Sequence, residues 1–175
     1  MSDLPLPPHQ LAPPVHLKRA QGFFDLEMFD DVQLELRAVP DIMPWSKEKK
    51  ALLTFLHQEI ADWSMMQSFA RSLRHEFPDE EVWWVSEAYA TRRSESVESA
   101  REILLDGLVK HNESAIIRYN LACYASLLKN PKECIDLLKE AVQRDQKYKV
   151  MALADEDLKP VHKALLQLGW GGGVD

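Results

Sequence analysis

An internal repeat of 34 residues constrains this chain more than any other feature of its sequence. When the chain is compared with itself at that offset, residues of like size coincide without a gap over its last two copies. Ala88 falls on Ala122, and Leu104 falls on Leu138. Weaker matches at the same offset extend the repeat towards the N-terminus. The four copies span about 13–46, 47–80, 81–114 and 115–148.

Each copy is predicted to be a pair of antiparallel helices joined by a tight turn. In the last copy, apolar residues recur at three- and four-residue steps on both sides of Asn130-Pro131. Asparagine caps helices, proline suits the first turn, and Glu133 can reach back to the amide of Asn130. No stretch shows the sustained alternation of a strand, so we expect an all-α fold.

Small residues recur where the two helices of a pair would cross. They are Ala20, Thr54, Ala88 and Ala122 in the first helices, and Ala100, Gly107, Cys134 and Ala141 in the second helices. A small side chain lets two helix backbones approach closely, and larger apolar residues then fill the remaining space. One such pair buries too little apolar surface to offset its lost conformational entropy, so the pairs must stack in an array.

Helix pairs of this length resemble the tetratricopeptide repeat (TPR). The fourth copy carries the resemblance best, through Tyr119-Asn120-Leu121-Ala122, Cys134 to Leu138, and Ala141. The third copy carries it through Trp84, Ala88, Ala100 and Leu104. The first copy departs most, because Arg19 stands where leucine is usual and Pro40 shortens the second helix. Residues 117–124 followed by 154–158 also look like the closing unit of bacterial TPR proteins.

The resemblance implies an all-α, right-handed superhelical solenoid of antiparallel helix pairs. Four TPR-like units form a single domain over residues 15–168, and a capping helix at about 155–168 closes it. Asp155 is the expected N-cap of that helix, and Leu158, Val161, Leu165 and Leu168 form its apolar stripe. A Pro-rich flexible tail, residues 1–14, and a Gly-rich flexible tail, residues 169–175, are expected to flank the domain.

The resemblance also implies a concave face lined by the first helices, on which a peptide or protein segment would bind. We expect the binding residues to be Phe24, Phe55, Val85, Tyr89, Arg92, Arg93, Tyr119 and Cys123. The two tyrosines are rigid anchors with a polar tip, and the arginines can pair with a carboxylate. The alternative is that Phe55 and Val85 pack between repeats and that the arginines belong to a solvated turn.

Charge and cysteine content narrow the classes of partner. Lys and Arg total 21 against 28 Asp and Glu, a net charge of −7, which argues against nucleic-acid binding. No apolar run is long enough for membrane insertion, and the N-terminus does not read as a secretory signal. The two cysteines, Cys123 and Cys134, are too few for a disulfide framework or a Cys-rich metal site. They suit buried thiols in the cytoplasm.

No catalytic motif emerges from the sequence. The six histidines are scattered, and the metalloprotease HExxH, phosphate-loop and GxSxG patterns are absent. Asp155-Glu156-Asp157 lacks the glycine of a calcium loop and is interpreted as a helix start. We therefore predict a non-enzymatic scaffold without a cofactor or metal. The alternative is a self-associating structural protein that forms a homodimer through repeat ends near Phe29 or Trp170.

Overall fold

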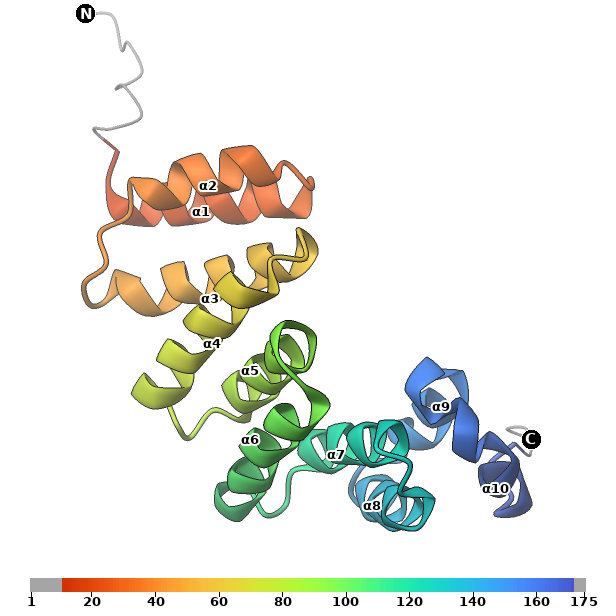
Figure 1. The fold of residues 1–175 in the computed structure, drawn as a ribbon. Coiled ribbons are helices and arrows are strands. Elements are labelled where there is room, and N and C mark those ends of the chain that lie inside the picture. The colour runs from red at the N-terminus through yellow and green to blue at the C-terminus, as the bar shows by residue number, and fades with distance from the viewer. Residues whose placement is uncertain (1–10, 172–175) are drawn as a thin grey trace, which may run out of the picture. The chain divides into compact units, whose positions relative to one another are not determined.

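The computed structural model describes residues 11–171, and all regular structure in that range is helical (Figure 1). Ten α-helices, the 3-10 helix η2 and no strand occur within those residues. The predicted all-α fold of sequential antiparallel helix pairs is therefore confirmed. Residues 1–10 of the expected N-terminal tail and 172–175 of the C-terminal tail lie outside the described range. The chain divides into two compact units, Met1–Glu76 and Phe77–Asp175.

Unit 1 contains two helix pairs. The first pair is α1 (Pro13–Asp25) with α2 (Phe29–Arg37), and the second is α3 (Trp45–Glu59) with α4 (Trp63–Glu76). The helix α1 begins with Pro13 and Pro14. Proline is tolerated there because the first N–H groups of a helix make no intrahelical hydrogen bond. The core formed by α1, α2 and α3 consists of Leu17, Ala20, Val32, Leu36, Val39, Leu52 and Leu56.

A buried carboxylate joins the two helices of the first pair. Glu35 on α2 is only 4% exposed. Its Oε2 lies 2.6 Å from Nδ1 of His16, and its Oε1 lies 2.8 Å from Nη2 of Arg19, both on α1. Because each carboxylate oxygen has a partner, the cost of removing Glu35 from water is offset within the pair.

The second helix of the first pair is unusually short. α2 has nine residues, whereas its counterparts α4, α6 and α8 each have 14. It ends at Arg37, three residues before Pro40, and proline disfavours the helical conformation in the residue that precedes it. The first pair therefore lacks the last turn or more of a full-length second helix, which α4 of the second pair retains.

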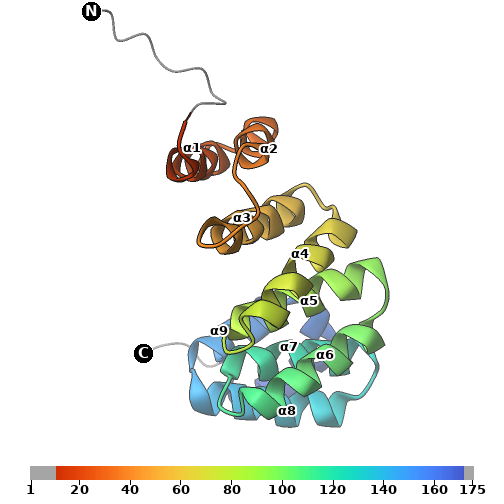
Figure 2. The ribbon, with the colours of Figure 1, turned by 90° about the vertical axis from the view of Figure 1, so that its left-hand side faces the viewer.

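Unit 2 contains two helix pairs and a C-terminal extension, which gather into one group in Figure 2. The pairs are α5 (Glu81–Ser94) with α6 (Val97–Lys110), and α7 (Ala115–Leu127) with α8 (Pro131–Arg144). The extension consists of α9 (Lys147–Ala154), η2 (Glu156–Val161) and α10 (His162–Gln167).

The helices α6, α7 and α8 of unit 2 each begin after a residue whose side chain accepts from one of the first N–H groups. Oγ of Ser96 accepts from the N–H of Ser99, and Oγ of Ser114 accepts from the N–H of Ile117. Asn130 caps α8 as predicted, accepting from the N–H of Glu133 at 3.3 Å. The return contact differs from the prediction, since Glu133 accepts from the side-chain amide of Asn130 at 2.7 Å rather than from its backbone.

Small residues occupy the helix crossings of unit 2. Ala88, Ala100, Ala122, Cys134 and Ala141 are all fully buried. A Cβ added to Gly107 would lie 3.1 Å from Cε3 of Trp84, so the backbone of α6 approaches that indole too closely for a larger residue. These crossings are the places where the repeat keeps side chains small.

Three of the turns that join paired helices contain a residue with the same left-handed backbone conformation. Glu27, Ala61 and Lys129 have φ of 58°, 56° and 60°, and they lie in the turns α1–α2, α3–α4 and α7–α8. In each case the N–H of the following residue bonds to the carbonyl five residues before it, as in Asp62 to His57 at 2.9 Å. This is the Schellman helix ending, and residues 27 and 61 are separated by the 34 residues of the sequence repeat.

Replacing Ala61 by glycine is expected to stabilise unit 1. A left-handed φ destabilises a residue that has a Cβ by about 1–2 kcal/mol, and glycine avoids this strain. Glycine also gives the unfolded chain more conformational freedom, which reduces the net gain in stability. We expect Ala61→Gly to raise the free energy of unfolding by about 1 kcal/mol in urea titrations followed by circular dichroism.

Ala38→Gly is the matched control for that variant. Ala38 is also exposed and also ends a helix of unit 1, but its φ is −80°. Glycine there is expected to lower stability by about 0.5–1 kcal/mol. Equal effects of the two substitutions would contradict the assignment of strain to residue 61.

The C-terminal extension departs from the single capping helix expected over 155–168. Asp155 acts as an N-cap, accepting from the N–H of Asp157 at 3.0 Å, but the helix that it starts is η2, which contains Pro160. The chain then turns into α10. Leu158, Val161 and Leu165 are buried as the stripe predicts, whereas Leu168 is 45% exposed.

Candidate functional site

The eight residues predicted to bind a partner all lie on the first helices of the pairs. Phe24 is on α1 and Phe55 is on α3, both in unit 1. The first-helix face of unit 2 comprises Val85, Tyr89, Arg92 and Arg93 on α5, and Tyr119 and Cys123 on α7. The structure brings Arg92, Tyr119 and Cys123 together with a further segment, residues 155–161, hereafter the 155–161 segment.

The 155–161 segment covers the part of the first-helix face that α7 provides. The hydroxyl of Tyr119 donates to Oδ2 of Asp155 at 2.7 Å, and Sγ of Cys123 donates to the same oxygen at 3.6 Å. Tyr119 is 5% exposed and Cys123 is 3% exposed. The sequence predicts an open surface for Tyr119 and Cys123, but in unit 2 the chain's own C-terminal extension lies over them.

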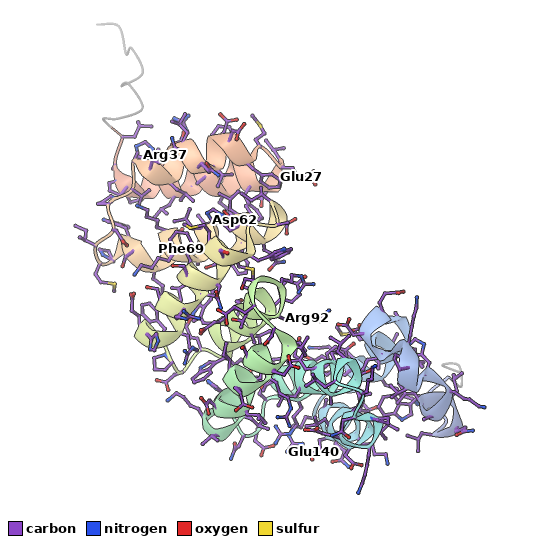
Figure 3. The ribbon with its side chains drawn as sticks, viewed as in Figure 1. Glu27, Arg37, Asp62, Phe69, Arg92 and Glu140 are labelled. Atoms are coloured by element: carbon purple, nitrogen blue, oxygen red, sulfur yellow. The ribbon has the colours of Figure 1, made fainter. Side chains whose placement is uncertain are left out.

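Asp157 fixes the same segment to both first helices. Nη2 of Arg92, on α5, donates to Oδ1 of Asp157 at 2.9 Å, and Nη1 donates to the other oxygen, a forked pair (Figure 3 labels Arg92). Oγ of Ser126, on α7, donates to the backbone carbonyl of Asp157 at 2.7 Å. Leu158 follows directly and is fully buried in the core of unit 2.

The electrostatics of this contact keep each group in its ordinary protonation state. Burial alone would lower the pKa of Arg92, but the hydrogen bond and charge of Asp157 outweigh it and raise that pKa. Burial raises the pKa of Tyr119, and its hydrogen bond to Asp155 raises it further. The guanidinium therefore stays charged and the phenol stays protonated, so both remain donors.

Cys123, Asp155 and Asp157 bring one sulfur and two carboxylates within 4.8 Å of one another. Their chemistry fits a hydrogen-bond cluster better than a metal site. Burial, together with the charges of Asp155 and Asp157, raises the pKa of Cys123, so its sulfur stays a thiol that donates to Asp155. The carboxylates already accept from Tyr119 and Arg92.

The open part of the face on α5 is an aromatic ring with a cation stacked on it. Tyr89 is half-buried, and the guanidinium carbon of Arg93 lies 3.6 Å from the centre of its ring. Nη1 of Arg93 also donates to the carbonyl of Tyr89 at 3.3 Å. Val85 is half-buried and packs on the core of unit 2.

Unit 1 presents its own first-helix surface on α1 and α3. Phe24 is half-buried and makes an edge-to-face contact with Phe29 at 6.0 Å between ring centres. Phe55 is 36% exposed. A hollow of about 510 Å³ lies between the two helices, and Leu17, Gln21, Trp45 and Glu48 are among its lining residues. Trp45 was not predicted as a lining residue of this surface, because the proline-containing stretch around it has no helical periodicity.

The two positions proposed for self-association lie partly inside the units. Phe29 packs against the core of unit 1, and Trp170 packs against the core of unit 2. Both side chains are half-buried. The self-association hypothesis anticipates an exposed apolar patch near these positions, and Leu26, Met28, Leu166 and Leu168, a few residues away in the sequence, are each more than 40% exposed.

Two buried tyrosines of α7, Tyr119 and Tyr124, should respond differently to loss of their hydroxyls. Tyr119→Phe removes the hydrogen bond to Asp155 and is expected to lower the free energy of unfolding by about 1–2 kcal/mol. The hydroxyl of Tyr124 is buried without a hydrogen-bond partner among the described residues, so Tyr124→Phe should leave stability unchanged or raise it by about 1 kcal/mol. Urea titrations of the two variants measure both effects, and equal losses would contradict the contact.

Both thiols should resist modification in the native chain. Cys123 and Cys134 are buried, and burial followed by the charge of Glu133 raises the pKa of Cys134 to about 12. The reactive thiolate is therefore scarce at mildly alkaline pH, and the reagent has little access. In the native chain, we expect Ellman's reagent to react with the two thiols only as fast as the chain unfolds. In urea, both thiols should react promptly. Prompt reaction of one thiol in the native chain would show that the 155–161 segment does not cover Cys123.

No described helix of the chain combines the length and apolar character needed to cross a bilayer. No protein-family model and no curated protein sequence matches the chain. Solved structures do match, and they span most of its length.

Three of the similar structures illustrate the likeness. TTC0263, a thermophilic TPR protein of Thermus thermophilus, aligns with a TM-score of 0.67 at 14% identity, covering 91% of this chain and 86% of its own. PilF of Pseudomonas aeruginosa aligns with a TM-score of 0.69 at 15% identity, covering 93% and 78%. YrrB, described as a TPR protein with an unusual peptide-binding site, aligns with a TM-score of 0.63 at 10% identity, covering 90% and 74%. At these identities the likeness shows a shared fold.

Proposed function

We propose that this chain, which has the tetratricopeptide-repeat fold, is a non-enzymatic scaffold that binds a protein or peptide segment on the first helices of its pairs. Scaffolding of protein–protein interactions is the typical work of this fold, and YrrB is a neighbour for which a peptide-binding site is described. The buried, protonated thiol of Cys123 makes a poor nucleophile, which supports a non-catalytic function.

The 155–161 segment is the observation that carries this proposal. In unit 2 the first helices hold a stretch of the chain through a forked arginine–carboxylate pair, a tyrosine hydroxyl and a serine hydroxyl bonded to a backbone carbonyl. These are the groups with which a protein recognises an acidic peptide. The contact supports a first-helix surface that accepts side-chain and main-chain groups of a short segment that is not α-helical.

The surfaces left for a partner are those that the 155–161 segment does not cover. In unit 1 they are Phe24, Phe55 and the hollow beside Trp45, which combine aromatic area with polar edges. In unit 2 they are Tyr89 and Arg93 with the adjoining part of Val85. Arg92, Tyr119 and Cys123 would act indirectly, by holding the 155–161 segment against the helices.

We place this scaffold in the cytoplasm as part of the same proposal. Cys123 and Cys134 are both free and buried, which suits a reducing compartment. The acidic balance of the chain favours a protein partner over nucleic acid.

Affinity capture from native cell extract, compared between matched variants, tests the proposed surface. Phe55→Ser removes an exposed aromatic from α3, and Leu34→Ser removes an apolar side chain that is 60% exposed on α2 of the same unit. We expect proteins recovered with the parent chain to fall about tenfold with Phe55→Ser, the loss typical of an aromatic anchor, and to persist with Leu34→Ser.

A recovered partner should then be titrated in purified form against both variants and against Tyr89→Ser. Retention of full affinity by Phe55→Ser and by Tyr89→Ser would contradict the first-helix surface. If no partner is recovered and light scattering shows that the mass rises with concentration, the self-associating alternative replaces the scaffold proposal.

A further inference from the structure

A second concave feature lies in unit 1 on a different face of α3. The helices α2, α3 and α4 enclose a pocket of about 230 Å³. Its walls are mainly apolar and include Leu36, Leu53, Met65 and Phe69. None of the eight residues assigned to partner binding lines it. The pocket is smaller than sites for drug-sized ligands, which run from about 300 to 1,000 Å³, so it suits a single large side chain.

The pocket exists because α2 is short. Leu36 and Arg37, the last two residues of that helix, line it, so it lies where α2 stops (Arg37 and Phe69 are labelled in Figure 3). A second helix of 14 residues, as in the other pairs, would continue past this point. The early end before Pro40 leaves apolar side chains of α3 and α4 without the cover that a further turn would give.

Charge at the pocket is positive although the chain is acidic. Arg37 is exposed, and the ammonium of Lys49 lies at the opening, where it donates to the carbonyl of Val39 at 2.7 Å. No carboxylate lines the pocket, while the whole chain has a net charge of −7. Such a local field attracts an anionic segment and repels a cationic one.

Part of the pocket wall on α4 is adaptable and part of it is fixed. Met65 is 41% exposed, and its unbranched thioether can adjust to different apolar shapes. Phe69 stacks on His57 with 5.6 Å between ring centres, and Nδ1 of His57 lies 3.3 Å from Oδ2 of Asp62. The stacking contact restricts the Phe69 ring before a partner arrives.

We propose that this pocket binds a partner segment that inserts one leucine or phenylalanine side chain, with aspartate or glutamate residues beside it. The apolar side chain fills the space between Leu53, Met65 and Phe69. The flanking carboxylates pair with Arg37 and Lys49 at the opening. This surface is separate from the first-helix surface, so the chain contacts protein segments through two different faces of unit 1.

Binding of three synthetic peptides to the chain tests the proposal. The probe is the capped octapeptide Glu-Glu-Ala-Leu-Phe-Ala-Glu-Glu, and the comparisons replace every Glu by Lys, or Leu-Phe by Ala-Ala. Methyl NMR of methionine- and leucine-labelled protein is followed over a millimolar titration. We expect saturable shifts of the Met65 and Leu53 methyls with the acidic probe, about tenfold weaker binding of the lysine peptide, and no shifts with the alanine peptide.

Charge reversal and a matched methionine pair sharpen the test. Arg37→Glu should weaken the acidic probe about tenfold and strengthen the lysine peptide. Met65→Glu should abolish binding, whereas Met28→Glu should not, although Met28 is 42% exposed in the same unit. Phe55→Ser should bind the probe normally, which separates this pocket from the proposed first-helix surface.

Several results would overturn the proposal. They are the absence of Met65 and Leu53 shifts at saturating probe, equal binding of the acidic and lysine peptides, and equal losses in Met65→Glu and Met28→Glu. Circular dichroism of each variant confirms that the chain is folded before the comparison.

Discussion

Close contact between helices at small residues is the constraint on which the rest of unit 2 depends. Ala88, Ala100, Ala122 and Cys134 are fully buried, and Gly107 leaves room for the ring of Trp84. Such crossings bring backbones together but leave the outer side of each helix uncovered. The next pair, or the C-terminal extension after the last pair, must therefore supply the missing contacts.

Features set by neighbouring residues could be predicted from the sequence, and those set by distant ones could not. Helical periodicity, the cap at Asn130 and the early end of α2 before Pro40 follow from residues a few positions apart. The pairing of Arg92 with Asp157 joins positions 65 apart, and no periodic pattern specifies it. The contact of Tyr119 with Asp155, 36 positions away, is likewise specified by no periodic pattern.

For the eight candidate residues, the sequence predicted the helix on which each lies but only partly predicted their exposure. All eight residues lie on first helices, because the repeat fixes which side of the pair each position occupies. Equivalent positions nevertheless have different surroundings. Tyr89 is half-buried, whereas Tyr119 is covered by the 155–161 segment. The repeat pattern predicts only features that all copies have in common. The 155–161 segment covers the last copy alone, so the pattern does not predict it.

The long-range contact of the 155–161 segment has a consequence for how the chain is made. Ribosomal synthesis releases α5 and α7 well before Asp155 and Asp157, so unit 2 emerges with Arg92 and Tyr119 lacking their acceptors. A chain ended early by a premature stop codon or a protease would keep Leu121 and Tyr124 near an open flank, a state that chaperones and degradation machinery recognise. Synthesis of the 155–161 segment thus supplies the acceptors that complete the contacts of α5 and α7.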